Sequence, residues 1–296
     1  MPIRTLACAL FGAALLLLVT ASGAFADAIS PESGGGSPNA ERIDTLYKYS
    51  FALGIVIFLL VEGVLIYCLV KFRHKRGGPE PAQIRGNTTL EVGWTVGAAL
   101  LLVVLAVVTF IYLPTIRNPA GPSTNGLNVA ASSQFASIDQ KPPPGSAKES
   151  LTIKVNGQQY LWRYTYPNGA YAYYDMVVPY DTTVILDITA SDVIHSWWIP
   201  KLGGKADAVP PASKYVNKTW FKITKKGNAK YGRFTGASYF TGNCAELCGD
   251  NHADMRARVI ALPPDEYLQW ADQQKQLIAQ SQQALAKQRQ ARGTRE

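Results

Sequence analysis

The chain has 296 residues, of which 47% are apolar and 17% are charged, and its formal net charge is +8. The apolar residues gather in long runs, which argues against a single soluble core and for membrane-spanning segments. The positive charge does not indicate nucleic-acid binding, because the basic residues are divided between a short loop and a domain predicted to be exported.

Residues 1–26 are predicted to be a secretory signal peptide. Arg4 precedes an apolar stretch, and Ala24-Phe25-Ala26 has the small-x-small pattern of a cleavage site. The mature chain would begin near Asp27, and residues 27–46 would form an exterior segment.

Residues 47–116 are predicted to form a transmembrane helical hairpin. Two apolar runs, residues 50–70 and 92–113, are each long enough to cross a bilayer, which needs about 20 apolar residues. The loop between them carries Lys71, Arg73, Lys75, Arg76 and Arg85. This cationic loop should be cytoplasmic, so both ends of the mature chain should face the exterior. Glu62 is costly inside a span, and we expect it to pack against a partner subunit.

The rest of the chain is predicted to be a linker, an all-β domain and a tail. Residues 117–149 are rich in Pro, Gly, Ser, Ala and Asn, which is typical of a poorly ordered spacer. Residues 150–263 contain short β-rich segments separated by turn signals, a pattern that favours a small Greek-key sandwich or barrel. Residues 264–296 are rich in Gln, Ala, Lys and Arg and should form a polar helix.

One group of side chains indicates a copper site. Its residues are His195, Cys244, Glu246, Cys248, His252 and Met255. Thiolate, imidazole and thioether together favour copper. Two thiolates could bridge two ions and leave one imidazole for each, with Met255 and the backbone carbonyl of Glu246 as weak axial donors. The alternative is a disulfide between the two cysteines, which is common in exported proteins. The chain has only three histidines, and two of them fall in this group, which favours the metal site.

This pattern, His195 followed by C-x-E-x-C-x3-H-x2-M, resembles the dinuclear copper A centre of subunit II of the haem-copper cytochrome c oxidases. Residues 191–197 and 205–210 also resemble that family, and the similarity covers residues 47–263. The resemblance implies a two-helix hairpin that spans a bacterial-type plasma membrane. It also implies an all-β, cupredoxin-like Greek-key domain on the exterior side of that membrane.

The resemblance also implies a function. The chain would accept electrons from a cytochrome c-type donor and pass them to haem in subunit I, where oxygen is reduced to water and protons are pumped. Subunit III is a further expected partner. The predicted spans contain no haem-ligating His, so the oxygen chemistry would belong to subunit I.

Four further residues take roles from the resemblance. The carboxylate of Glu246 would bind magnesium shared with subunit I, or it is simply solvated. Glu91 would lie near the mouth of a proton path, or it only stabilises a helix N-terminus through the helix dipole. Tyr160 stands where the family usually has a Trp that receives electrons, with Trp162 beside it, although both could be core aromatics.

The sequence departs from the family pattern at two places, and two alternative functions share some of its features. Pro211-Ala212 replaces a common Gly-Arg. The basic residues of residues 222–233 suggest a donor that is acidic, neutral or tethered to the membrane. A copper A subunit of a nitric oxide reductase and a membrane-anchored copper-binding protein are the alternatives, whereas a quinol oxidase subunit would lack the copper ligands.

Overall fold

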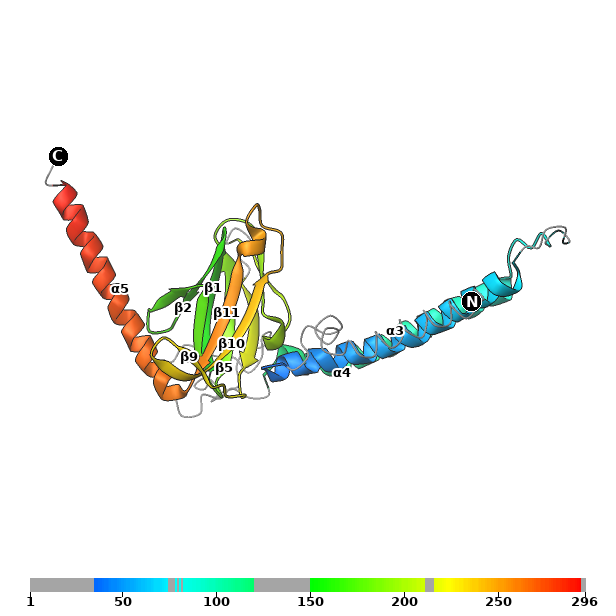
Figure 1. Ribbon diagram of the computed structural model, residues 1–296, viewed down its shortest axis with the longest axis horizontal. Helices are drawn as coiled ribbons and strands as arrows, with labels where there is room; N and C mark the ends of the chain where they lie inside the picture. The colour runs from blue at the N-terminus through cyan, green and yellow to red at the C-terminus, as the bar shows by residue number, and fades with distance from the viewer. Residues whose placement is uncertain are drawn as a thin grey trace, which may run out of the picture. The chain divides into compact units, whose positions relative to one another are not determined.

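The structure is a computed structural model that describes residues 35–73, 78, 80, 82–119, 150–210 and 216–293 (Figure 1). The predicted signal peptide, most of the predicted linker and Pro211-Ala212 lie outside the described residues. The chain divides into a helical unit, residues 45–114, and a second unit made of residues 1–44 and 115–296.

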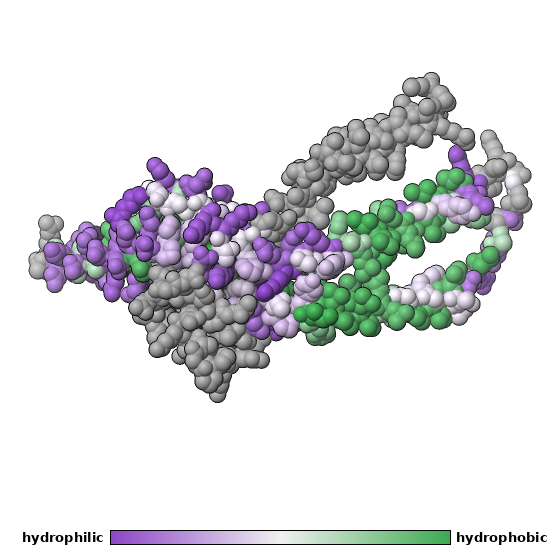
Figure 2. Space-filling model, turned by 90° about the horizontal axis from the view of Figure 1, so that it is seen from below, coloured by the Kyte–Doolittle hydropathy of each residue, from purple (hydrophilic) through white to green (hydrophobic). Residues whose placement is uncertain are grey.

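Two long apolar helices dominate the helical unit. They are α3 (Pro38–Lys71) and α4 (Thr88–Arg117), and both are long and apolar enough to cross a membrane. Their Leu, Ile, Val and Phe side chains are largely exposed, which in water would be unfavourable but suits contact with lipid (Figure 2). Each helix extends beyond its predicted apolar run at both ends.

The second unit is a β sandwich of two mixed sheets. The first sheet has the order β3-β2-β1-β5-β8, and the second has the order β4-β11-β10-β6-β7 with β9 paired to β10. The first sheet comprises β1 (Ser150–Gln158), β2 (Leu161–Thr165), β3 (Tyr171–Tyr173), β5 (Thr183–Ala190) and β8 (Asn217–Lys222). The second comprises β4 (Asp175–Pro179), β6 (His195–Trp198), β7 (Ala206–Ala208), β9 (Ala229–Tyr231), β10 (Phe234–Cys244) and β11 (Arg256–Leu262). The predicted fold class, a helical hairpin and an all-β domain, is confirmed.

The core lies between the two sheets. In β1, Leu151, Ile153 and Val155 are buried while the residues between them are more exposed, as the two-residue period of a strand requires. The pairs β1·β5 and β4·β11 are parallel, so the connections between their strands cross over from one sheet to the other. This arrangement brings the end of β10 next to β6.

The C-terminal helix α5 (Pro264–Gly293) packs on the sandwich only through its first half. Trp270 contacts Tyr166 edge to face at 5.1 Å between ring centroids, and the side-chain amide of Gln274 donates to the Tyr171 carbonyl at 2.9 Å. From residue 279 to residue 292 every side chain is exposed. The helix is therefore held by its aromatic first turns.

Short segments that flank the helical unit also belong to the β unit. Asn39 is buried and donates its side-chain amide to the Trp220 carbonyl at 3.0 Å. The indole nitrogen of Trp220 in turn donates to the Ile116 carbonyl at 2.9 Å. Strand β8 thus contacts both residues 35–44 and residues 115–119.

Candidate metal centre

The sulfur and imidazole side chains predicted from the sequence lie together at one end of the sandwich. His195 is the first residue of β6, Cys244 is the last residue of β10, and the other donors lie in the loop that leads to β11. Cys244 pairs with Trp197 across the two antiparallel strands, which carries its side chain to the same end as His195. The loop then folds back over both strands.

The donor atoms form two neighbouring pairs, each made of one thiol sulfur and one imidazole nitrogen. The Sγ atoms of Cys244 and Cys248 are 4.0 Å apart, so no disulfide joins them. Nδ1 of His195 lies 3.9 Å from the Cys244 sulfur, and Nδ1 of His252 lies 3.6 Å from the Cys248 sulfur. Each thiol therefore has an imidazole of its own.

Two weaker donors complete the cluster. The Met255 sulfur lies 3.8 Å from the Cys248 sulfur, and the Glu246 carbonyl lies 3.3 Å from the Cys244 sulfur. The carboxylate-bearing side chain of Glu246 is exposed. The backbone of Glu246 thus faces the cluster while its side chain belongs to the surface.

The cluster is shielded from water. His195 and Met255 have no exposed surface, and Cys244 and Cys248 are 5% and 4% exposed. His252 is half-buried. The ligand atoms of His195, Cys244 and Cys248 lie within 4.8 Å of one another, which is close enough to hold a metal ion.

An unpredicted carboxylate orients His195. Nε2 of His195 lies 2.8 Å from Oδ1 of Asp192, which also accepts from the Val193 N–H at 2.7 Å. The ring nitrogen that faces the carboxylate carries a proton, so Nδ1 is the nitrogen through which His195 could bind a metal ion. The signal for this contact in the sequence is an Asp three residues before the predicted ligand His195.

The turn between β1 and β2 reaches both halves of the cluster. The backbone N–H of Gln159 donates to Oδ2 of Asp192 at 2.7 Å, and its side-chain amide donates to the Cys248 carbonyl at 2.6 Å. Gln159 thus links the support of His195 to the loop that carries Cys248. Nothing in its residue type or spacing pointed to this role.

Two glycines let these segments approach. A Cβ on Gly157 would lie 2.9 Å from Cδ2 of His195 and 3.0 Å from Cζ3 of Trp162. Gly249 has φ +128°, which disfavours any other residue, and a Cβ there would lie 2.6 Å from the Tyr160 hydroxyl. Both positions therefore require glycine for close packing around the donors.

The ionisation of the metal-free cluster favours a bound cation. Burial raises the pKa of the Cys244 thiol, but its contacts with His195 and with backbone groups outweigh burial and lower that pKa to about 6. Burial and the neighbouring Cys244 raise the pKa of Cys248 to about 11. One thiolate is thus present at neutral pH, and a cation would stabilise the second.

The charged partners of His195 shift its pKa too. Burial lowers the pKa of His195, but Cys244 and Asp192 raise it by a larger amount. Burial raises the pKa of Asp192, while hydrogen bonds from Gln159, His195 and Val193 lower it overall. The Asp192 side chain is therefore a carboxylate that accepts hydrogen bonds at neutral pH.

The two aromatics proposed for electron entry lie in different surroundings. Tyr160 is half-buried, and its hydroxyl accepts the N–H of Asp250, in the loop between β10 and β11, at 3.1 Å. Trp162 is fully buried and packs edge to face on His195 at 5.9 Å. Tyr160 therefore touches the loop from the surface, and Trp162 lies beneath His195.

Two other predicted residues, Glu91 and Glu62, belong to the helical unit. Glu91 is in the first turn of α4, where its carboxylate accepts the Asn87 N–H at 3.3 Å and Asn87 caps Leu90 at 3.2 Å. Glu62 is partly shielded within α3. The magnesium role of Glu246 involves a side chain that points to the surface.

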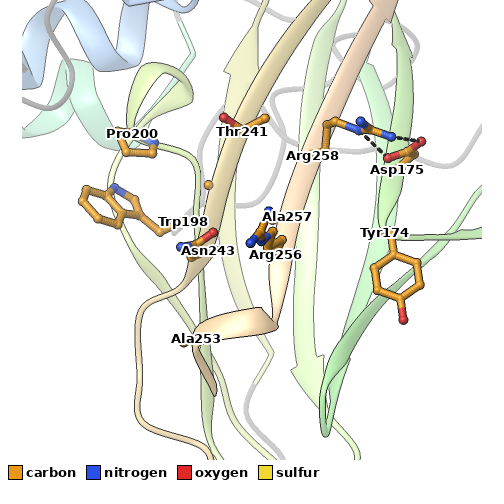
Figure 3. A pocket seen from close by; sticks show the side chains of 11 residues that line it. Tyr174, Asp175, Trp198, Pro200, Thr241, Asn243, Ala253, Arg256, Ala257 and Arg258 are labelled. Carbon is orange, nitrogen blue, oxygen red and sulfur yellow. Dashed lines mark hydrogen bonds and ion pairs between the residues drawn. The ribbon is translucent and has the colours of Figure 1, made fainter. Parts of the chain in front are cut away.

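A larger hollow adjoins the loop but is not the metal site. Its volume is about 730 Å³, and it lies on the outer face of β10 and β11, with Trp198 and Tyr174 on opposite sides (Figure 3). Asp175 and Arg258 form a two-point ion pair there at 2.6 and 2.8 Å. No cysteine, histidine or methionine lines it, so its chemistry does not suit a soft metal.

Comparisons with known proteins agree with the fold and the site. Residues 32–111 match the family model of the cytochrome c oxidase subunit II transmembrane domain, and residues 172–262 match that of the periplasmic domain. The chain is 34% identical to cytochrome c oxidase subunit 2 of Alkalihalophilus pseudofirmus over 85% of its length, and it spans 64% of that relative. It is 31% identical to the subunit 2 of a Synechocystis species, over 79% of this chain and 73% of the relative.

A solved structure is also similar. It is the crystal structure of the periplasmic domain of subunit II of a Bradyrhizobium japonicum cytochrome oxidase, with 31% identity and a TM-score of 0.37, covering 43% of this chain and 94% of that one. The matched domains place the two helices in the plasma membrane and the β domain on its exterior side, as predicted. The chain belongs to the cytochrome c oxidase subunit II family, whose members are subunits of an oxidoreductase.

Proposed function

We propose that this chain receives single electrons at a dinuclear copper A centre and passes them to haem in subunit I of a cytochrome c oxidase. Oxygen would be reduced to water there, coupled to proton pumping. The observation that carries the proposal is the pair of unbridged thiols 4.0 Å apart, each with its own imidazole. A mononuclear blue-copper site needs one thiolate and two imidazoles, so the second cysteine favours two ions.

The donor set fits copper. Cys244, Cys248, His195 and His252 would hold the two ions, together with the Met255 sulfur and the Glu246 carbonyl as weaker donors. When bound, the copper pair supplies reversible one-electron redox chemistry. The chain's own part is to hold these donors in a buried position and to keep water from them, since four of the side chains are at most 5% exposed.

The surface near Tyr160 supports a role in electron entry. Asp192 and Asp250 are exposed residues next to the Gln159-Tyr160 turn. The Asp192 carboxylate accepts the Gln159 N–H, and the Asp250 backbone N–H donates to the Tyr160 hydroxyl. Carboxylates around an entry point attract a basic donor. We therefore propose a cytochrome c-type donor with a positive docking face, in place of the acidic, neutral or tethered donor suggested by the basic residues of residues 222–233.

Glu246 and Glu91 keep their proposed roles through their positions. The exposed carboxylate of Glu246 can bind a hard cation such as magnesium together with a partner subunit, which we propose to be subunit I. Glu91 caps the cytoplasmic end of α4, a position that suits either a proton entrance or helix stabilisation. Subunit III is proposed as a further partner.

The burial of the donors weighs against one rival function, a copper-delivery protein. A copper-delivery protein needs an open site from which metal exchanges, whereas His195, Met255 and both thiols are enclosed. A nitric oxide reductase subunit would use the same site, and only the chemistry of the partner subunit separates it from an oxidase.

Electron paramagnetic resonance of residues 150–293, loaded with copper under reducing conditions, tests the proposal. Hyperfine structure from one electron shared by two copper nuclei is expected. His252→Gln should abolish that shared signal, while Gln274→Glu, on the far side of the sandwich, should preserve it. A spectrum from a single copper ion, or a Cys244 to Cys248 disulfide without bound copper, would reject the dinuclear centre.

A further inference from the structure

The larger hollow, on the outer face of β10 and β11, lies beside the metal centre without containing it (Figure 3). Its volume of about 730 Å³ falls within the range of about 300–1,000 Å³ that is typical of ligand sites. Three of its lining residues, Asn243, Ala253 and Arg256, are each next in sequence to a predicted metal donor. An occupant of the hollow would therefore contact the segments that carry the donors.

The hollow contains a cation, Arg256, that is available to a ligand. Asp175 and Arg258 form a two-point ion pair at 2.6 and 2.8 Å, so their charges offset each other. Arg256 is exposed, and it has no hydrogen-bonding or ion-pair partner among the residues that the structure describes. The planar guanidinium of an arginine binds a carboxylate through two parallel hydrogen bonds. The hollow therefore offers a binding position for a carboxylate.

The surroundings of the hollow add positive charge. The Lys205 ammonium lies 4.9 Å from the centre of the ring of Trp198, which lines the hollow. Along β10, the hydroxyl of Tyr239 donates to the Lys230 carbonyl, and Tyr239 is two residues, about 7 Å, from the lining residue Thr241. The charged residues tied to the hollow by these contacts are Lys205, Lys230, Arg256 and Arg258, against Asp175 and, next to Ala253, Asp254. Cations predominate, so the field favours an acidic ligand.

Two aromatic side chains bound the hollow on opposite sides (Figure 3). Trp198 is half-buried, and Tyr174 is 53% exposed. Tyr174 has φ +63°, a left-handed conformation that bulky residues seldom adopt. Its N–H donates to the Trp162 carbonyl and its carbonyl accepts the Arg258 N–H, both at 3.2 Å, which holds it there. A large, exposed ring kept in such a conformation is better explained by a contact with a ligand than by packing.

The kinds of side chain in the lining indicate a protein ligand. Trp, Tyr and Arg are the residues that most often carry the binding energy of protein–protein interfaces, and Trp198, Tyr174 and Arg256 lie in one hollow. A free inorganic anion could bind the guanidinium but would gain nothing from the two rings. A peptide segment can use all three side chains at once.

We propose that this hollow binds an acidic segment of a partner protein on the exterior side of the membrane. A carboxylate of that segment binds Arg256, and an apolar or aromatic side chain beside it lies between Trp198 and Tyr174. This partner is opposite in charge to the basic electron donor proposed to dock beside Tyr160. The site is independent of the copper proposal, because peptide binding is measured without reference to the metal.

Fluorescence anisotropy of the full chain in phosphatidylcholine nanodiscs tests the site. The probe is the peptide Glu-Asp-Phe-Glu-Asp with a neutral fluorophore at one end and an amide at the other. Saturable binding that weakens with added salt is expected. Arg256→Gln should bind the probe about 10-fold less tightly, because it loses a charge-assisted hydrogen bond. The peptide Glu-Asp-Ser-Glu-Asp should also bind less tightly, since it offers nothing to the two rings.

Two further variants keep the test specific. Lys154→Gln removes an exposed cation from the outer face of the first sheet, between the buried Ile153 and Val155, and should bind the probe as the unaltered chain does. Tyr174→Gly suits the left-handed backbone and removes the ring, so its circular dichroism should be unchanged while the probe binds about 10-fold less tightly.

The docking site is overturned if the unaltered chain shows no saturable binding, or if Arg256→Gln binds the probe as tightly. Equal losses in Arg256→Gln and Lys154→Gln would overturn it as well, because the effect would then come from the overall charge. Equal binding of the Phe and Ser peptides, or displacement of the probe by an equal concentration of inorganic phosphate, would reveal a simple anion site and overturn the protein assignment.

Discussion

Asp192→Asn should weaken copper binding without unfolding the domain. The Asp192 carboxylate accepts hydrogen bonds from His195 Nε2, the Gln159 N–H and the Val193 N–H at 2.7 to 2.8 Å. Asn has only one acceptor oxygen, so at least one of these bonds is lost and an NH₂ group meets a donor. A hydrogen bond to a charged group contributes about 1.5–3 kcal/mol.

The expected loss of copper affinity is about 10- to 100-fold, the usual effect of removing the group that orients a metal-binding histidine. The assay is titration of residues 150–293 with copper against a competing chelator, with paramagnetic resonance of the loaded form. The matched control is Asp175→Asn, which breaks an ion pair with Arg258 outside the donor cluster and should leave the affinity unchanged.

If Asp192→Asn bound copper as tightly as the unaltered domain, the carboxylate would not be needed to orient His195. His195 would then be held by packing against Trp162 alone, and the carboxylate would be only a surface charge. Equal losses in Asp192→Asn and Asp175→Asn would also contradict this orienting role, because the effect would then come from general destabilisation.

Three further changes have expected outcomes. Gly157→Ala should push the His195 ring from its place and destabilise the domain by about 1–3 kcal/mol, measured by urea unfolding; unchanged stability would mean that the ring moves freely. Trp270→Ala should cost about 3–5 kcal/mol, because it removes the buried contact with Tyr166, and hydrogen exchange should show α5 released; an α5 that stays protected would contradict this. Burial raises the pKa of Tyr231 to about 12, so its neutral form is favoured in the folded state. The contribution of Tyr231 to the stability of the metal-free domain should therefore be present below pH 10 and be lost between about pH 10 and 12; a stability that does not fall in this range in urea unfolding would disprove it.

The two membrane-spanning helices could be predicted because each long apolar run adds up evidence over many residues. The long strand β10 could not be predicted in this way. A run of twenty apolar residues has few alternative structures, so both spans follow from composition. Strand β10 reads Phe-Thr-Gly-Ala-Ser-Tyr-Phe-Thr-Gly-Asn-Cys, and Gly and Asn, which are depleted in strands, interrupt its aromatic and Thr residues. Gly242 is required there because a Cβ would lie 1.9 Å from the Trp198 carbonyl oxygen. That need arises only once β6 and β10 are paired.

The donors could be named from sequence, but the residues that hold them could not. The side chains of Cys, His and Met indicate metal binding by their type alone, and a short loop carries most of them. Gln159 and Gly157 are ordinary residues whose importance depends on the parallel pairing of β1 with β5, which brings Gly157 opposite Ala190 and next to the Ser191-Asp192 turn. Such long-range pairing leaves no local pattern in the chain.

The Gln159 turn explains how separate segments can form one rigid site. Through its backbone it contacts Asp192, which orients His195, and through its side chain it contacts the carbonyl of Cys248. Any shift of the loop relative to β6 would therefore break a hydrogen bond at 2.6 or 2.7 Å. Donors held at fixed positions by their surroundings rearrange little when an electron arrives, and this favours fast transfer. Because Tyr160 is the next residue and binds the same loop, the residue proposed to receive the electron is built into the segment that keeps the donors in place.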